Sequence, residues 1–143
     1  MDESKMYRGF DPKKQAAHEA ELIARLGEGV RPAIEKSKEI LARTPPAEFN
    51  ARQAEQAAIE DGMAEALKSG APADSAAVQA LVKRLHGWVG GWWGEAPTRA
   101  RFEGLAGWYV EHPEFRARYE AKAPGLAEYL QAAMQAFAAR ELA

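Results

Sequence analysis

Apolar residues recur every three or four positions along much of the chain, which is the spacing of amphipathic helices. The strongest stripe of this kind consists of Val78, Leu81, Val82, Leu85, Trp88, Val89 and Trp92. Alanine is abundant, β-branched residues are few, and apolar and polar positions do not alternate as they do in half-buried strands. The pattern predicts an all-α domain of six or seven helices.

Prolines and glycines mark the predicted helix boundaries in the first half of the chain. Asp11 is placed to cap a helix whose first residue is Pro12, and Gly27 ends that helix. The pair Pro45-Pro46 ends a short second helix and precedes a long third one, which runs to Ser69-Gly70.

Similar signals divide the second half of the chain. Gly90-Gly91 and Gly94 are expected to interrupt or end the helix with the strongest stripe, and Pro97-Thr98 to begin the next one. His112-Pro113 breaks the pattern again, because the residue before a proline is displaced from helical geometry. Pro124 is expected as the first residue of the closing helix.

The apolar content is uneven. Residues from 78 onward carry enough large apolar side chains to close a core among themselves, whereas residues 1–45 have few to contribute. The sequence therefore predicts a firm C-terminal part and a loosely held N-terminal part.

Chain length and this unevenness together predict the domain organisation. A chain of 143 residues fits one domain. The polar segment 1–11 is predicted to be a leader, followed by a single helical domain over 12–143. Within that domain, 12–43 forms the loosely held helices and 46–143 the core.

Composition and charge narrow the classes of function. With 19 basic and 21 acidic residues the net charge is −2, which provides no general attraction to nucleic acid. The absence of cysteine excludes disulfides, thiolate metal sites and cysteine nucleophiles, and it fits a reducing compartment. No apolar run is long enough to span a bilayer, and the N-terminus is too polar for a signal peptide. We expect a soluble cytoplasmic protein that does not bind membranes.

Residue patterns typical of catalysis or cofactor binding are missing. The sequence contains no nucleophile-elbow serine, no phosphate-binding glycine loop and no acidic pair at metal-ligand spacing. His18, His86 and His112 are not spaced as paired ligands, so neither a metal nor haem is expected. The prediction is a protein that is not an enzyme and uses no cofactor.

All four tryptophans lie between His86 and Tyr109. Trp92 and Trp93 are adjacent, and neighbouring residues on a helix point about 100° apart, so both cannot face one core. At least one of them should be exposed or line a cavity. Trp108 and Tyr109 pose the same problem, and one of these two is expected to be a core residue.

Several short motifs resemble the TipAS antibiotic-recognition family. They are Gly9-Phe10-Asp11-Pro12, His86-Gly-Trp88-Val89, Phe102-Glu-Gly104-Leu105, the segment from Trp108 to Phe115, and the segment from Ala123 to Leu130. They occur in the family's order, and the similarity is strongest over residues 82–138.

The resemblance implies a globin-like helical fold with a deep cleft for large, mostly apolar ligands such as thiopeptides and heteroaromatic antibiotics. It implies the effector-binding C-terminal domain of a MerR-type transcription activator, whose N-terminal helices fold over the ligand as a lid. DNA would then be bound only through a DNA-binding domain that this chain lacks. The isolated domain is expected to be a monomer and the full-length regulator a homodimer.

One departure from the family affects the expected chemistry. Some members carry a cysteine soon after the aromatic pair that matches Trp92-Trp93, and this cysteine captures ligands covalently. Gly94-Glu95-Ala96-Pro97-Thr98 stands there instead. Recognition is therefore expected to be non-covalent.

The aromatic residues supply the candidate ligand contacts. These are Trp88, Trp92, Trp93, Phe102, Trp108 and Tyr109, with Tyr7 and Phe10 as lid contacts. For Trp88, core packing is an alternative, and Tyr7 and Phe10 are otherwise the apolar part of a frayed terminus. The competing function is a helical protein-interaction or dimerisation domain that docks through an exposed aromatic patch.

Overall fold

The computed structural model describes residues 12–143 of the chain and the side chains from residue 16 onward. Within these residues the chain forms seven α-helices and one 3-10 turn, which confirms the all-α prediction. The elements are α2 (Pro12–Leu26), η1 (Glu28–Val30), α3 (Arg31–Arg43), α4 (Pro46–Lys68), α5 (Ala76–Trp93), α6 (Arg99–Glu111), α7 (Pro113–Lys122) and α8 (Leu126–Glu141). The predicted leader over 1–11, with its lid contacts Tyr7 and Phe10, lies outside the described residues.

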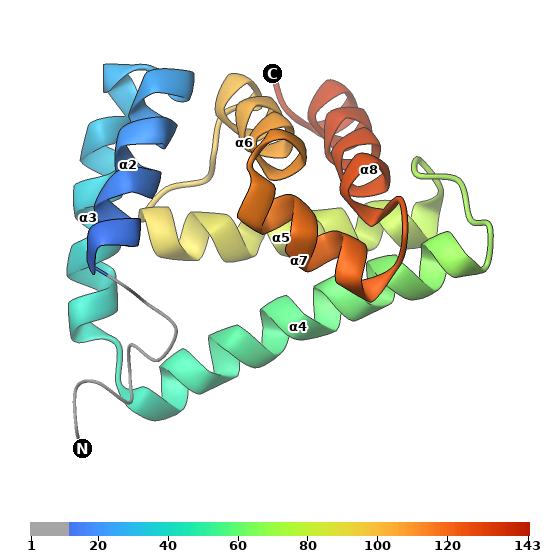
Figure 1. Ribbon diagram of the computed structural model, residues 1–143, viewed down its shortest axis with the longest axis horizontal. Coiled ribbons are helices and arrows are strands. Elements are labelled where there is room, and N and C mark those ends of the chain that lie inside the picture. Colours follow the sequence, from blue (N-terminus) through green and yellow to red (C-terminus); the bar gives the residue numbers. More distant parts are fainter. Residues whose placement is uncertain (1–11) are drawn as a thin grey trace.

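Helices α2 and α3 stand side by side at one end of the molecule (Figure 1). Helices α4 and α5 extend away from this pair, and α6 and α8 lie on the other side of α5 from most of α4 (Figure 1). Helix α7 contacts α4, α6 and α8. A salt bridge of 3.2 Å between Lys38 Nζ and Glu19 Oε2 joins α3 to α2. None of the described helices is both long and apolar enough to cross a membrane.

Most predicted helix boundaries are confirmed, with local hydrogen bonds at several of them. Pro12 and Pro46 are first helical residues. Thr98 caps α6 through its side-chain oxygen, which accepts the Arg101 N–H at 3.3 Å. His112 caps α7 in the same way, because its Nδ1 accepts the Glu114 N–H at 3.2 Å.

The expected interruption at Gly90-Gly91 is wrong. Helix α5 continues to Trp93 and ends at Gly94, which has the left-handed φ of 79° that favours glycine at a helix end. The reason for glycine inside the helix is close approach: a Cβ at Gly90 would lie 3.3 Å from the backbone of Ala96. Gly90 therefore makes room for the α5–α6 connection.

The predicted start of the closing helix at Pro124 is also wrong. Ala123, Pro124, Gly125 and Leu126 form a turn in which the Leu126 N–H donates to the Ala123 carbonyl oxygen at 3.1 Å. Gly125 has φ 87° and ψ 0°, the values of the third residue of a type II turn, and proline is common at the position before it. The helix begins only after this turn, at Leu126.

Most of the completely buried core residues lie on α6 and α8, with Val30 of η1 and Val78 and Val82 of α5 also fully buried. Phe102, Ala106, Ala127, Ala133, Met134 and Ala138 have no exposed surface. Four of these six are alanines, whose small side chains let helix backbones approach closely. This block supports the helices that build the candidate site.

Residues 16–45 supply a small part of the core cluster. Leu22, Val30, Ala33 and Ile34 belong to the core cluster, and Val30 is fully buried. Apolar residues are few here, but η1 and the start of α3 place them against the body. Whether 12–43 is loosely held stays a prediction.

Candidate functional site

Phe102 lies in the centre of the core. Its side chain has no exposed surface. Its ring makes edge-to-face contacts with His86 and Phe137, at centroid distances of 5.0 and 5.9 Å. His86 is itself fixed by a hydrogen bond of 2.9 Å between its Nε2 and the Pro97 carbonyl oxygen. Phe102 therefore supports the packing of α6 against α5 and α8.

Trp88 and Trp92 belong to an aromatic seam between α4 and α5, which also contains Phe49. The Trp92 ring lies 6.3 Å from the Trp88 ring and 6.2 Å from the Phe49 ring, edge to face in both cases. Trp88 Nε1 donates a hydrogen bond of 2.8 Å to the Arg52 carbonyl oxygen, and the Arg52 guanidinium lies 4.5 Å above the Trp92 ring. Trp92 is half-buried, as is Trp93, which packs at the edge of the core. Both indoles thus keep some exposed surface.

Trp108 is held by helix α2. Its Nε1 donates a hydrogen bond of 2.9 Å to Glu21 Oε2, and the same oxygen lies 3.4 Å from His112 Nε2. The His18 ring lies against both aromatic partners, with its centroid 6.0 Å from Trp108 and 4.9 Å from His112. We call His18, Glu21, Trp108 and His112 the α2 clasp. Glu21 of α2 accepts the hydrogen bond of the buried Trp108 indole on α6. The docking of α2 and the burial of Trp108 therefore stabilise each other.

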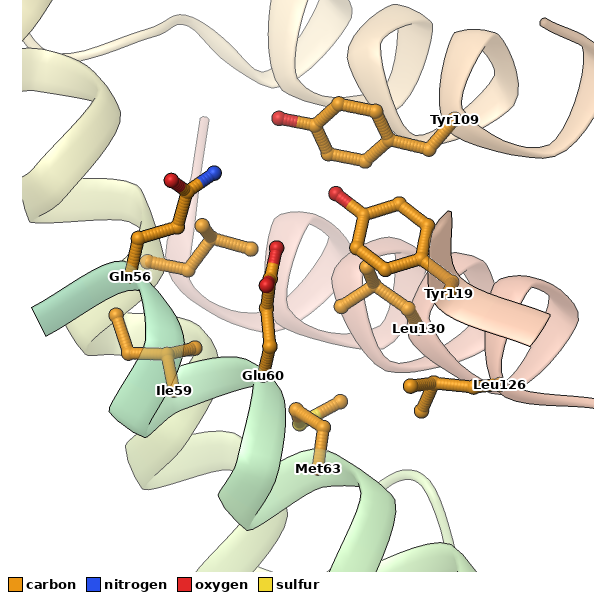
Figure 2. Close-up of a pocket in the computed structure, with 9 residues that line it drawn as sticks. Gln56, Ile59, Glu60, Met63, Tyr109, Tyr119, Leu126 and Leu130 are labelled. Carbon is orange, nitrogen blue, oxygen red and sulfur yellow. The ribbon is translucent and has the colours of Figure 1, made fainter. Parts of the chain in front are cut away.

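Tyr109 lines a pocket between α4 and the helices α5 to α8 (Figure 2). The complete lining is Gln56, Ile59, Glu60, Met63, Leu85, Tyr109, Tyr119, Leu126 and Leu130. The cavity leaves about 10 Å³ for a water-sized molecule, which is the space of a single water. Trp108 and Tyr109 are both buried, because α2 covers one side of α6 while α7 and α8 cover the other.

Four polar groups converge in the pocket. Figure 2 shows the Glu60 carboxylate, the Gln56 amide and the hydroxyls of Tyr109 and Tyr119 directed into the same space. The Glu60 side chain is only 7% exposed, and its Oε1 accepts a hydrogen bond of 2.9 Å from Arg118 Nη2 on α7. An apolar wall with a few convergent polar groups is the usual composition of a small-molecule site.

The electrostatic environment keeps both tyrosines protonated. Burial raises the pKa of Tyr109 far above its usual value, and the negative charge of Glu60 raises it further. Burial likewise raises the pKa of Tyr119, with smaller contributions from Tyr109 and Glu60. At neutral pH both hydroxyls of the pocket are therefore protonated and lie beside one carboxylate.

Aromatic contacts connect the pocket to the α2 clasp. Tyr119 lies edge to face with Tyr109, at a centroid distance of 5.4 Å. Tyr109 is stacked with Trp108 at 6.5 Å. Phe115 touches both, at 5.5 Å from Tyr109 and 4.8 Å from Trp108. A continuous series of ring contacts thus joins the pocket tyrosines to Trp108 of the α2 clasp.

Sequence reasoning did not identify the polar residues of the pocket. Gln56 and Ile59 lie three positions apart and so share a face of α4, but nothing in their spacing marks them as pocket residues. The available signal was Glu60, a charged residue four positions after Gln56 and next to Ile59, on the same side of that helix. Its partner Arg118 is 58 residues away, and no local pattern predicts that pairing. Among the described residues, no group of three or more histidine and acidic side chains could hold a metal ion.

Comparison with known proteins identifies the class of this domain. The family model described as the TipAS antibiotic-recognition domain matches residues 18–137. The chain belongs to this family.

Particular relatives are regulators of transcription. The HTH-type transcriptional regulator SkgA of Caulobacter vibrioides strain NA1000 / CB15N is 44% identical over 138 residues, which are 96% of this chain and 54% of the relative. The protein of the same name from strain ATCC 19089 / CIP 103742 / CB 15 matches equally. The chain thus spans about half the length of these curated relatives. No solved structure matches, so the globin-like arrangement stays an implication of the family resemblance.

Proposed function

We propose that this domain is the effector-binding domain of a MerR-type transcriptional regulator and that it binds large apolar or cyclic aromatic compounds without a covalent bond. The observation that carries the proposal is the pocket, in which Glu60, Tyr109 and Tyr119 converge between apolar walls. Family membership and the regulators among the relatives support it. The lack of cysteine rules out covalent capture by a thiolate.

A large ligand requires the pocket to open. Space for one water is far less than the several hundred Å³ of a typical ligand site. The wall formed by α7 is the part that can yield, because this helix has only 10 residues and contacts the pocket through Tyr119. An incoming aromatic compound would then replace the contacts between Tyr119 and Tyr109 with contacts of its own.

The α2 clasp connects this opening to regulation. Displacement of Tyr109 acts on Trp108 and Phe115, and through Trp108 on Glu21 of α2. A ligand that favours one arrangement of α2 over another shifts the population between them, which is the requirement for an allosteric signal. In a full-length homodimeric regulator, a DNA-binding domain elsewhere in the protein would read this change, and the regulator would act in the cytoplasm.

The test is a binding screen with matched variants. Thiopeptides and heteroaromatic polycycles are titrated into the protein, and binding is followed by tryptophan fluorescence and thermal shift. We expect Tyr109→Leu to weaken binding of a hit at least tenfold, since it removes a ring that lines the pocket. Trp92→Leu is the control for the α4–α5 seam, and equal losses in both variants would contradict the pocket as the site.

The half-buried tryptophans favour one alternative, a protein-interaction or dimerisation domain. Trp92 and Trp93 retain exposed aromatic surface, and such surface is enriched at interfaces. Size-exclusion chromatography at increasing concentration distinguishes the two functions. A dimer that dissociates in Trp92→Leu, together with no response to any compound, would favour the interaction domain.

A further inference from the structure

The buried carboxylate of Glu60 carries the only negative charge among the residues that line the pocket. Its side chain is 7% exposed, and apolar residues form much of its surroundings. A buried carboxylate is tolerated only when a cation or several hydrogen-bond donors compensate its charge. Here the compensation comes from Arg118, whose Nη2 lies 2.9 Å from Glu60 Oε1.

The two partners of this ion pair differ in their access to water. The Arg118 side chain is 46% exposed, so its guanidinium can leave Glu60 and be hydrated at the surface. Glu60 is enclosed, so water cannot hydrate its carboxylate when Arg118 leaves. The pair can therefore be opened from the Arg118 side only if another group inside the pocket takes over the contact with Glu60.

The remaining polar groups near the pocket show which kind of group could replace Arg118 beside Glu60. The Tyr109 and Tyr119 hydroxyls stay protonated and can donate hydrogen bonds, but they carry no positive charge. The neighbouring salt bridge on the same α4–α7 interface, between Lys122 Nζ and Asp61 Oδ1 at 2.7 Å, involves a carboxylate that is 67% exposed. Lys122 is therefore already paired, and on the solvent side of the interface.

We infer that the effector is an organic cation, in which a protonated amidine, guanidine or amine on an apolar body replaces the Arg118 guanidinium at Glu60. This inference rests on the proposed function and names the chemical class of its ligand. The cationic nitrogen donates to the Glu60 carboxylate, while the apolar body contacts Ile59, Leu126 and the two tyrosine rings. Compounds with a carboxylate are excluded, because a second anion beside Glu60 would be repelled in a poorly solvated site.

The experiment uses three compounds of the same shape and different charge. 2-Naphthamidine is a cation at neutral pH, 2-naphthamide is neutral and 2-naphthoate is an anion. Binding of each to the 143-residue protein is measured by isothermal titration calorimetry. We expect the amidine to bind at least tenfold more tightly than the amide, and the carboxylate not to bind. The Arg118 side-chain NMR signal should shift to that of a solvated guanidinium when the amidine binds.

Two substitutions one residue apart test the role of Glu60. Glu60→Gln should retain the affinity for the amide and remove the preference for the amidine. Asp61→Asn, which alters the exposed salt bridge on the same helix, should leave the preference unchanged. Arg118→Met keeps the aliphatic stem but removes the competing cation, so it should bind the amidine several-fold more tightly. The three-compound comparison on the unaltered protein keeps the test decisive if either Glu60→Gln or Arg118→Met does not fold, as judged by circular dichroism.

The possible failures are distinguishable. Equal affinity for amidine and amide, or a preference that persists in Glu60→Gln, would overturn the inference while leaving the effector-binding function intact. Failure of these three compounds and of the whole antibiotic screen to bind would overturn the proposed function, and the inference with it. Binding of screen compounds with no amidine binding would overturn the inference alone.

Discussion

Helices α8 and α2 both pack against α6, but different forces hold them there. On the α8 side the contact is apolar, with fully buried alanines and the Phe102 and Phe137 rings 5.9 Å apart. On the α2 side Leu22 is buried, but much of the contact is polar. Glu21 accepts from Trp108, and Arg25 forms a salt bridge with Glu111.

This difference indicates how each helix behaves when the molecule is perturbed. Burial of apolar surface contributes about 25 cal/mol per Å² and is not screened by salt. A surface ion pair contributes about 0–1 kcal/mol and weakens as salt is added. Helix α2 can therefore detach at a lower free-energy cost than α8.

The largest expected effect is on the apolar side. Phe102→Ala should lower the global free energy of unfolding by about 3–5 kcal/mol, because it removes a fully buried ring and leaves a cavity between α5, α6 and α8. Urea unfolding followed by circular dichroism measures this loss. A decrease in the free energy of unfolding below about 1 kcal/mol would mean that the core rearranges to fill the space. The apolar packing of α8 would then be no stronger than the polar packing of α2.

A smaller and local effect is expected on the polar side. Glu21→Ala removes the acceptor of the Trp108 indole N–H, so the free energy of opening α2 should fall by about 1–3 kcal/mol. Amide hydrogen exchange should accelerate in residues 16–26 and remain unchanged in residues 126–138. Glu28→Ala, which alters an exposed salt bridge with Arg31, is the control. Equal acceleration in both helices would show that they unfold as one unit.

Alkaline pH is expected to weaken the body of the domain. Tyr109 and Tyr119 have raised pKa values when folded, so above pH about 10 the unfolded chain releases protons that the folded one keeps. Stability should be unaffected by these groups below that pH and should then decrease by up to about 1.4 kcal/mol per pH unit for each tyrosine. Denaturant unfolding from pH 9 to 11 tests this, and Tyr119→Phe should give a shallower decline. Identical slopes would exclude Tyr119 as a cause.

The smallest expected effect comes from a substitution that raises the helix propensity of α6 but disturbs the docking of α2 against it. Gly104→Ala should stabilise α6 by about 0.5–1 kcal/mol, but its Cβ would overlap the Leu26 side chain at the end of α2. We expect an unchanged or slightly raised melting temperature together with faster amide exchange in α2. Gly87→Ala, where a Cβ meets no atom within 4 Å, should give the stabilisation without the change in α2. Slower exchange in α2 of the Gly104 variant would contradict the close contact.

The sequence by itself determined the all-helical class, the family and most helix ends, because these depend on nearby residues. Proline at the start of α4, the threonine cap of α6 and the left-handed Gly94 act within one turn of helix. The family motifs are likewise contiguous segments. The failures at Gly90-Gly91 and Pro124 occurred where a second segment or a tight turn set the local geometry.

Only the tertiary structure decided which residues line the candidate site. Trp92 and Trp108 were equal candidates by composition, yet one lies in the α4–α5 seam and the other is held by Glu21 from 87 positions earlier. Glu60 looks like an ordinary helix carboxylate until α7 brings Arg118 to it from 58 residues away. A side chain's periodicity shows which face of its own helix it occupies. Whether that face meets water, a core or a cavity depends on helices distant in the sequence.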